Sequence, residues 1–211
     1  MGIILELQQD ATSSDIDILS LLRKAYLVAR KLKLADFAEW IDHEMNGYGD
    51  NDAVPQYRYH KGPLVISNPL NGEIPALNSG LKKPLSIASK EPVSSLLALA
   101  ENCKEGYIYS TFSDYMSAEL SRKYRLPIAM RFSIKIPINQ LYATIDAVRN
   151  SVLEWAITLE EEGITGDGLK FTEAEIRKAN NSHTININNI VGTFEKSQIQ
   201  QSTDNSDQKM D

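Results

Sequence analysis

Apolar residues recur at helical intervals over the first fifty residues of the chain. Residues 14–32 carry apolar side chains three and four positions apart, which predicts an amphipathic helix that begins at a Ser14 cap. A second apolar stripe follows over residues 37–45, with Asp36 as the candidate cap. These two segments predict a helical hairpin, and residues 3–9 predict a short helix before it.

Short β-type runs and further helices make up the middle of the chain. Residues 56–60, 64–67 and 85–87 predict short strands between turns rich in Pro, Gly and Asn, and residues 130–136 alternate most clearly. The longest predicted helix starts near Ile138, ends at Gly163 and has the length to be the spine of the domain. Three further helices are predicted to start near Pro92, Ser113 and Thr172. The pattern predicts an α+β fold, mainly helical, with a helical hairpin, a long C-terminal helix and a small antiparallel β element.

The last thirty residues differ from the rest in composition. We place a boundary between a domain at residues 1–179 and a tail at residues 180–211, which is rich in Asn, Gln and Ser and cannot fill a core alone. The tail is either a disordered end or a β-prone segment that pairs with identical tails in a homo-oligomer. On the second interpretation, a chain that ends at Asn180 is monomeric. The apolar side chains available for that pairing are Ile185, Ile187, Ile190 and Ile199.

Composition indicates an ordinary soluble chain and narrows its chemistry. Hydrophobic residues make up 42 % and charged residues 24 % of the chain. The net charge of −6 argues against non-specific wrapping of nucleic acid. Cys103 is the single cysteine, which excludes an intramolecular disulfide and a CxxC zinc site, and we expect it to pack on a helix. No signal peptide and no membrane-spanning apolar run is visible, so we expect a cytoplasmic protein without membrane contact.

The stretch FAEWIDHEMNGYGD, residues 37–50, concentrates the polar candidates of the first helices. We interpret His43 and Glu44 as part of a solvated helix face, with a functional surface as the alternative. The run HEMNG lacks the second His of an HExxH zinc motif. Gly47 is expected to cap the helix, and Tyr48 can then fold back onto its apolar stripe.

A glycine-rich run, GITGDGLKF, follows the longest helix. It comes after a helix rather than a strand and has no GxxxxGK[ST] pattern, so we do not expect it to hold a phosphate group. Thr172 and Glu175 are spaced as a capping box for the small helix that follows.

Two blocks of sequence resemble the AbiTii domain, which is found in proteins associated with abortive infection and phage defence. The first block, residues 21–58, contains EWxxxExNGY, and the second, residues 141–168, contains AVRNxxLEWAxxLE. The resemblance extends over about residues 3–179 and includes tails like the one seen here. It implies a role in defence, as a toxin or as an interaction module, and it brings no catalytic mechanism to these residues.

Three hypotheses for function follow from the residues. The first is a defence module without catalytic activity that oligomerises through its tail and binds a phage component, a host component or a partner protein. The second is a metal-dependent nuclease or another hydrolase toxin, in which Asn150 and Glu154 face His43 and Glu39 and hold a metal. The catalytic candidates are Glu39, His43, Glu44, Arg149, Asn150 and Glu154, with Arg23 and Arg30 as further polar residues of the first block.

The first hypothesis is favoured because a structural account covers the same residues. In that account Arg149 or Arg23 forms an inter-helix ion pair, and Trp40 and Trp155 pack in the core. We therefore expect neither a cofactor nor a metal.

A nucleic-acid-binding protein is the third hypothesis. It depends on five basic residues within fourteen positions, interleaved with aromatic side chains. This basic cluster consists of Arg122, Lys123, Arg125, Arg131 and Lys135.

Overall fold

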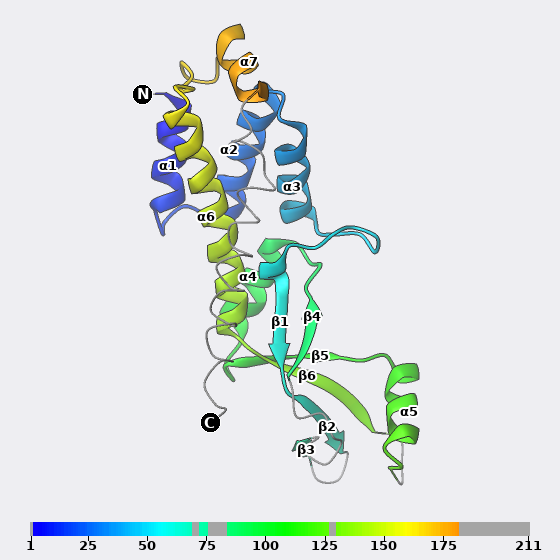
Figure 1. The fold of residues 1–211 in the computed structure, drawn as a ribbon. Helices are drawn as coiled ribbons and strands as arrows, with labels where there is room; N and C mark the ends of the chain where they lie inside the picture. Colours follow the sequence, from blue (N-terminus) through cyan, green and yellow to red (C-terminus); the bar gives the residue numbers. More distant parts are fainter. Residues whose placement is uncertain (1, 69–71, 76–83, 127–129, 182–211) are drawn as a thin grey trace, which may run out of the picture. The chain divides into compact units, whose positions relative to one another are not determined.

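The computed structural model describes residues 2–68, 72–75, 84–126 and 130–181 (Figure 1). These residues contain seven α-helices and two small antiparallel sheets, which confirms the predicted α+β class. The isoleucines predicted to pair tails lie outside the described residues. The chain forms two compact units: a helical unit, Met1–Tyr57, Lys90–Leu96 and Ala143–Asp211, and a sheet unit, Arg58–Ser89 and Leu97–Tyr142.

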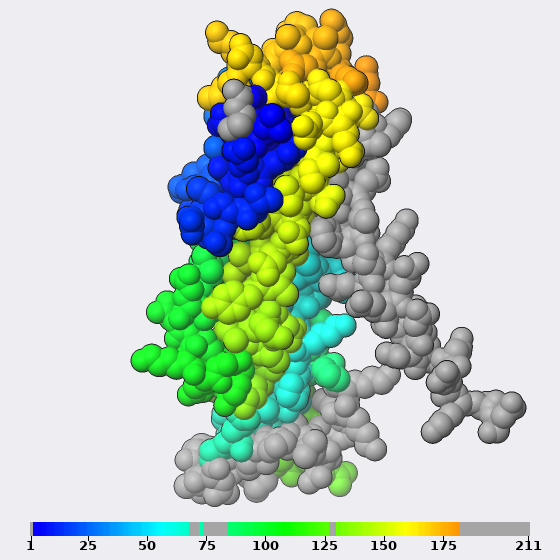
Figure 2. Space-filling view, turned by 90° about the vertical axis from the view of Figure 1, so that its left-hand side faces the viewer, coloured from blue at the N-terminus to red at the C-terminus, as the bar shows by residue number. Residues whose placement is uncertain are grey.

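The helical unit is a bundle whose core is formed by the predicted apolar stripes. Its helices are α1 (Ile3–Thr12), α2 (Ile18–Lys31), α3 (Ala35–Asn46), most of α6 (Asn139–Glu161) and α7 (Glu173–Asn181). Phe37 stacks on Trp155 at 3.9 Å between ring centroids and also contacts Trp40 at 5.1 Å. Both tryptophans are buried, as predicted. Figure 2 shows α1 (blue) against the second half of α6 (yellow), where Gln8 Nε2 donates to the Ala156 carbonyl at 3.2 Å.

The predicted starts of α2 and α3 are wrong by a few residues. Asp17, not Ser14, caps α2, because its Oδ2 accepts the Ser20 N–H at 3.0 Å. The α2–α3 hairpin is confirmed, but its turn is so tight that α3 begins directly after Leu34. The Leu34 N–H donates to the Ala29 carbonyl, and its own carbonyl already accepts from Ala38. Asp36 therefore lies inside the first turn, where its charge suits the helix dipole.

The sheet unit contains two sheets. β1 (Tyr59–Gly62) pairs with β4 (Leu85–Ala88), and a four-stranded sheet has the order β3-β2-β6-β5. Its strands are β3 (Gly72–Pro75), β2 (Leu64–Asn68), β6 (Arg131–Pro137) and β5 (Tyr107–Thr111). Of the predicted strand at 56–60, the first part is instead a 3-10 helix, Gln56–Arg58, and β1 starts after it. β3 and β5 were not predicted.

One face of the four-stranded sheet is apolar and packs against helices of the same unit. Ile134 and Ile136 of β6 form a buried cluster with Ala100 and Leu141. Phe132 forms a second cluster with Leu64, and several half-buried apolar side chains pack against it. The Ala100 side of this core comes from α4 (Val93–Asn102), and α5 (Asp114–Lys123) is capped by Ser113 as predicted. Alternation along β6 therefore leaves its polar side chains on the other face.

Cys103 lies just beyond the end of α4 rather than within it. Its side chain is half-buried, and Sγ donates to the Tyr107 carbonyl at 3.3 Å. The residue thus joins the end of α4 to the start of β5, and the prediction of a helical position is wrong.

Candidate functional site

The acidic residue of the EWxxxExNGY motif is the centre of a buried hydrogen-bond network. Glu44 is completely buried, and its Oε1 accepts hydrogen bonds from the Tyr48 and Tyr57 hydroxyls, each at 2.7 Å. Trp40 Nε1 donates to the Tyr57 hydroxyl at 2.8 Å. The prediction of a solvated face is wrong for Glu44, because Tyr48 and Tyr57 arrive from the segment beyond the helix and enclose its carboxylate.

The network keeps the Tyr57 hydroxyl in its neutral form. Burial raises the pKa of Tyr57 well above its ordinary value, and the nearby Glu44 charge raises it further. The ring of Tyr57 retains some exposure, whereas its hydroxyl is enclosed between Trp40 and Glu44. A neutral hydroxyl can donate to a carboxylate and accept from an indole at the same time, which is the arrangement observed.

Gly47 allows the chain to turn into this network. It has φ of 94°, and a Cβ at this position would lie 2.8 Å from the Lys90 carbonyl oxygen. The next residue, Tyr48, donates its N–H to that same carbonyl at 2.8 Å. The predicted helix end at Gly47 and the return of Tyr48 are both confirmed. The NGY part of the motif is thus explained by backbone geometry.

His43 and Glu39 lie on α3 outside the buried network. The His43 ring contacts the Tyr48 ring at 5.0 Å between centroids, and its Nε2 is 3.5 Å from Asp52 Oδ2. Asp52 also accepts the Gly49 N–H at 2.6 Å, so His43 packs on a short turn after the helix. The Glu39 side chain is exposed.

Arg149 of α6 holds the connection between α1 and α2. Its guanidinium donates to the carbonyls of Asp10 at 3.3 Å, Ser13 at 3.1 Å and Ile16 at 2.8 Å. The predicted inter-helix ion pair is therefore wrong for Arg149, whose partners are backbone carbonyls. Asp10 lies in the last turn of α1, and Ser13 and Ile16 lie between α1 and α2, so a planar guanidinium supplies donors to carbonyls at the end of a helix and in the connection that follows it. Asn150 follows directly and is exposed.

The metal site of the hydrolase hypothesis is not assembled in the described part of the chain. There, no three His, Cys, Asp or Glu side chains gather closely enough to hold a metal ion. Glu154 is exposed on α6, while His43 faces Asp52. The structure thus does not bring Glu154, His43 and Glu39 together.

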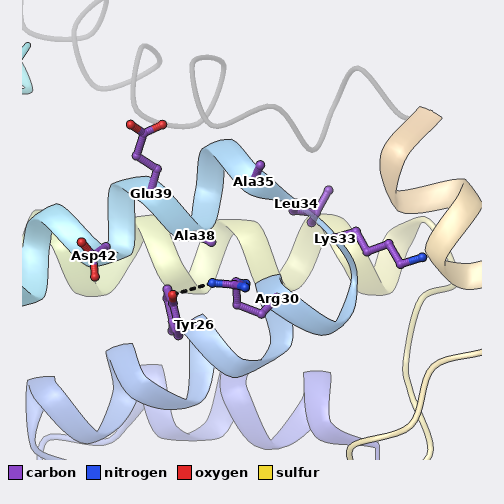
Figure 3. A pocket seen from close by; sticks show the side chains of 8 residues that line it. All are labelled: Tyr26, Arg30, Lys33, Leu34, Ala35, Ala38, Glu39 and Asp42. Carbon is purple, nitrogen blue, oxygen red and sulfur yellow. Dashed lines mark hydrogen bonds between the residues drawn. The ribbon is translucent and has the colours of Figure 1, made fainter.

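A pocket of about 640 Å³ opens between α2 and α3 (Figure 3). Arg30 Nη1 donates to the Tyr26 hydroxyl at 2.9 Å on the α2 side. Glu39 and Asp42 contribute carboxylates from α3. Glu39 and Arg30 were both candidates from the sequence, but their common position at one pocket was not predicted. Their proximity depends on the tight hairpin turn, where Lys33 has the left-handed φ of 60°.

The polar face of the four-stranded sheet carries an aromatic and ionic cluster. Lys135 Nζ lies 3.0 Å from Glu73 Oε1 and 3.7 Å above the centroid of the Tyr107 ring. The Tyr109 hydroxyl also donates to Glu73. Hydrogen bonds from Tyr109 and then Lys135 lower the pKa of Glu73 below its ordinary value. Neither tyrosine was predicted as a site residue, although both alternate with Ile108 as strand residues do.

The five residues of the basic cluster occupy two parts of the sheet unit. Arg131 and Lys135 lie on the polar face of β6. Arg122, Lys123 and Arg125 lie at or just after the end of α5, and Arg122 is paired with Glu119. α5 meets the sheet from the apolar face, where Tyr124 contacts Phe132. The cluster in sequence is therefore not one stripe in space.

Comparison with known families identifies the family to which the chain belongs. The AbiTii family matches it over residues 2–184. The chain belongs to the AbiTii family. The family name refers to abortive infection, a form of bacterial defence against phage. No curated protein and no solved structure gives a significant match to the chain.

The AbiTii motifs that suggested the family have structural roles in this chain. Trp40, Glu44 and Tyr48 of the first motif form the buried network, and Arg149 and Trp155 of the second support a loop and the core. The contacts of Arg149 and Trp155 join segments far apart in sequence, whereas Tyr48 bonds to Glu44 within one helical turn. The motifs therefore explain how an AbiTii chain folds, and the more exposed surfaces are where a ligand has room to bind.

The glycine-rich run of this AbiTii chain is occupied by a side chain of the protein. Glu175 Oε1 accepts the N–H groups of Thr165 at 3.1 Å and Gly166 at 3.0 Å. Its Oε2 accepts from Thr172, while Thr172 Oγ1 accepts the Glu175 N–H, which confirms the predicted capping box. Burial raises the pKa of Glu175, but these hydrogen bonds outweigh it and the pKa lies below its ordinary value. An internal carboxylate thus takes the place of an external anion.

None of the helices in the described part of the chain is both long and apolar enough to cross a membrane.

Proposed function

We propose that this AbiTii protein acts in antiphage defence as a binding and oligomerising module without catalytic activity of its own. The observation that carries the proposal is the role of the motif residues. Glu44 accepts from two tyrosine hydroxyls, and Arg149 donates to three backbone carbonyls. Side chains held in this way stabilise the fold and have no place in proton transfer to a substrate.

In this proposal the protein works in the cytoplasm as a homo-oligomer. Residues 182–211 supply the contacts between chains, through the isoleucines predicted from the sequence. Binding of a phage component, a host component or a partner protein to the folded domain then acts through clustered chains. Growth arrest of the host, the toxin-type outcome, would follow from clustering rather than from hydrolysis.

Protection of cells against phage tests this proposal. The assay compares plating efficiency on a host carrying the gene with its neighbouring genes, for wild type, Glu154→Gln, and a chain truncated after Asn181. Glu154 is exposed, so its substitution leaves the fold intact. The proposal expects full protection with Glu154→Gln and loss of protection with the truncation.

The alternative of a metal-dependent nuclease or other hydrolase toxin predicts the reverse pattern. Protection would then be lost with Glu154→Gln or His43→Gln, although both variants remain folded and oligomeric. Purified protein would also degrade nucleic acid, and a chelator would stop the reaction. Either result would replace the binding module by an enzyme.

A further inference from the structure

Charge is divided unequally between the two units. The sheet unit contains ten Lys and Arg residues and five Asp and Glu residues, a formal net charge of +5. The whole chain has a charge of −6, so the helical unit carries −11. The whole chain is therefore acidic although its sheet unit carries a net positive charge. Net charge therefore disfavours a nucleic-acid partner for the helical unit but not for the sheet unit.

We propose that the outer face of the four-stranded sheet binds single-stranded nucleic acid. The outer face is defined as the side that carries the polar residues of β6 and their directly opposed partners. Its members are Val65, Ser67, Glu73, Tyr107, Tyr109, Thr111, Arg131, Ser133 and Lys135. The inference rests on the proposed function, because it names a ligand for the binding module.

Two tyrosines give the outer face a surface on which bases can stack. The Tyr109 side chain is 43 % exposed, and Tyr107 beside it is half-buried with its ring edge-on at 5.8 Å. The apolar face is packed against the core, so the rings stand on a supported sheet. Aromatic side chains on such a sheet stack with bases irrespective of sequence.

Two basic residues on the same strand can contact phosphates on either side of such a base. Arg131 is exposed, and Lys135 lies four residues further along β6, about 13 Å away on the same face. Ser133 lies between them on β6 and is buried, whereas the neighbouring side chains Ser67 and Thr111 are exposed and keep the edges of the face open. Phosphate oxygens accept from both cation types, which gives affinity without a sequence preference.

Glu73 acts as an internal competitor on this face. Its carboxylate pairs with Lys135 and accepts the Tyr109 hydroxyl, so it occupies both groups that a nucleotide would use. A phosphate that binds Lys135 has to displace the carboxylate. We therefore expect the outer face to bind nucleic acid with moderate affinity, and removal of the Glu73 charge should increase that affinity.

Single strands fit this face better than a duplex does. In a duplex the bases are stacked on one another, and their flat surfaces are closed to tyrosine rings. Reading a groove needs a helix or ribbon that projects from the protein, whereas the outer face is a sheet with small residues between its two basic positions.

Fluorescence anisotropy with labelled oligonucleotides tests the inference on the full-length protein. The probes are twenty-nucleotide oligo-dT, oligo-U and a mixed-sequence duplex at low salt. We expect both single strands to bind, with dissociation constants of about 1–100 µM, and the duplex to bind more weakly. Affinity should fall as salt rises.

Substitutions locate the binding to the outer face. Tyr109→Leu should weaken binding about tenfold, whereas Tyr109→Phe, which keeps the ring, should not weaken it. Lys135→Met should weaken binding and reduce the slope of log affinity against log salt by about 0.7. Glu73→Gln should tighten binding several-fold. Lys61→Met is the matched control, because Lys61 is exposed in the same unit but belongs to the other sheet, and it should change little.

The inference is overturned if single strands do not bind at low salt, if the duplex binds more tightly, or if Tyr109→Leu and Lys61→Met behave alike. The proposed function fails differently, through loss of protection with Glu154→Gln or through hydrolysis of the probes. If protection depends on the tail but no strand binds, only the assignment of the ligand is wrong.

Discussion

Glu44 and Glu39 lie five residues apart on α3 and have opposite surroundings. Glu44 is completely buried and bonded to two tyrosine hydroxyls, whereas Glu39 is exposed at the pocket. Glu44→Ala would leave both hydroxyls without their buried acceptor, so we expect it to lower the free energy of unfolding by about 2–4 kcal/mol. Glu39→Ala should change it by about 0.5 kcal/mol or less. Urea denaturation of the two variants measures the difference.

Equal stability of the two variants would contradict the network. Glu44 would then be a polar group that the fold does not need, and a catalytic role for it would again have to be considered. The two variants are a matched pair because each substitution removes one glutamate carboxylate from the same helix.

At the scale of single residues, the sequence identified the important positions of the first motif but not their roles. Gly47 and Tyr48 could be predicted, because a glycine requirement and a fold-back depend on near neighbours. The burial of Glu44 could not, since it depends on Tyr57, thirteen residues away and beyond an irregular turn. Polar residues on helices are usually solvated, and local patterns contain no sign of the exception.

At the scale of elements, long helices were predictable, whereas the two edge strands of the four-stranded sheet, β3 and β5, were not. The apolar residues of α6 keep helical spacing over about six turns, and a pattern of that length predicts a helix without ambiguity. β5 has the sequence YIYST, in which the apolar position alternates with tyrosines that are themselves amphipathic. Because of that ambiguity β5 was not predicted, and neither were the three residues that it contributes to the outer face.

The attachment of α7 gives a prediction for the dependence of stability on pH. Glu175 joins α7 to the glycine-rich run through Thr165, Gly166 and Thr172. Its pKa in the folded protein lies below the ordinary value of 4.5, so its contribution is fully present above that value and is lost as the pH falls through the folded pKa. Glu175→Ala should therefore lower stability by about 1 kcal/mol at pH 7, and by progressively less as the pH falls below 4.5.

Glu173→Ala is the control for this prediction. Glu173 lies in the first turn of the same helix and is exposed. Its substitution should cost less than Glu175→Ala at pH 7. Urea denaturation at pH 7, 5 and 3 gives the comparison, and a cost for Glu175→Ala that persists unchanged at pH 3 would mean that the carboxylate charge is not what holds α7.

At the scale of the whole molecule, the separation of charge affects assembly as well as binding. Each chain carries a formal charge of −6, with the acidic residues concentrated in the helical unit. Chains that associate bring like charges together, and salt screens that repulsion over about 10 Å at 0.1 M. The proposed contacts between amide-rich, β-prone tails would be largely uncharged, so we expect them to persist in salt.

These opposing effects lead to a prediction that combines tail and salt. We expect full-length protein to form a defined homo-oligomer whose population rises between about 50 and 500 mM salt, because screening removes repulsion without weakening the tail contacts. A chain truncated after Asn181 should be a monomer at both concentrations. The truncation retains Asn180, whose Nδ2 donates to the Leu32 carbonyl at 2.7 Å and holds α7 in place.

Light scattering after size exclusion, on both chains at both salt concentrations, makes this measurement. An oligomer that depends on the tail and strengthens with salt separates assembly from nucleic-acid binding, which must weaken with salt. An oligomer that persists after truncation would place the contacts in the folded units. If the oligomer instead dissolves in high salt, the basic sheet unit of one chain binds the acidic helical unit of another, and the tail is not the assembly device.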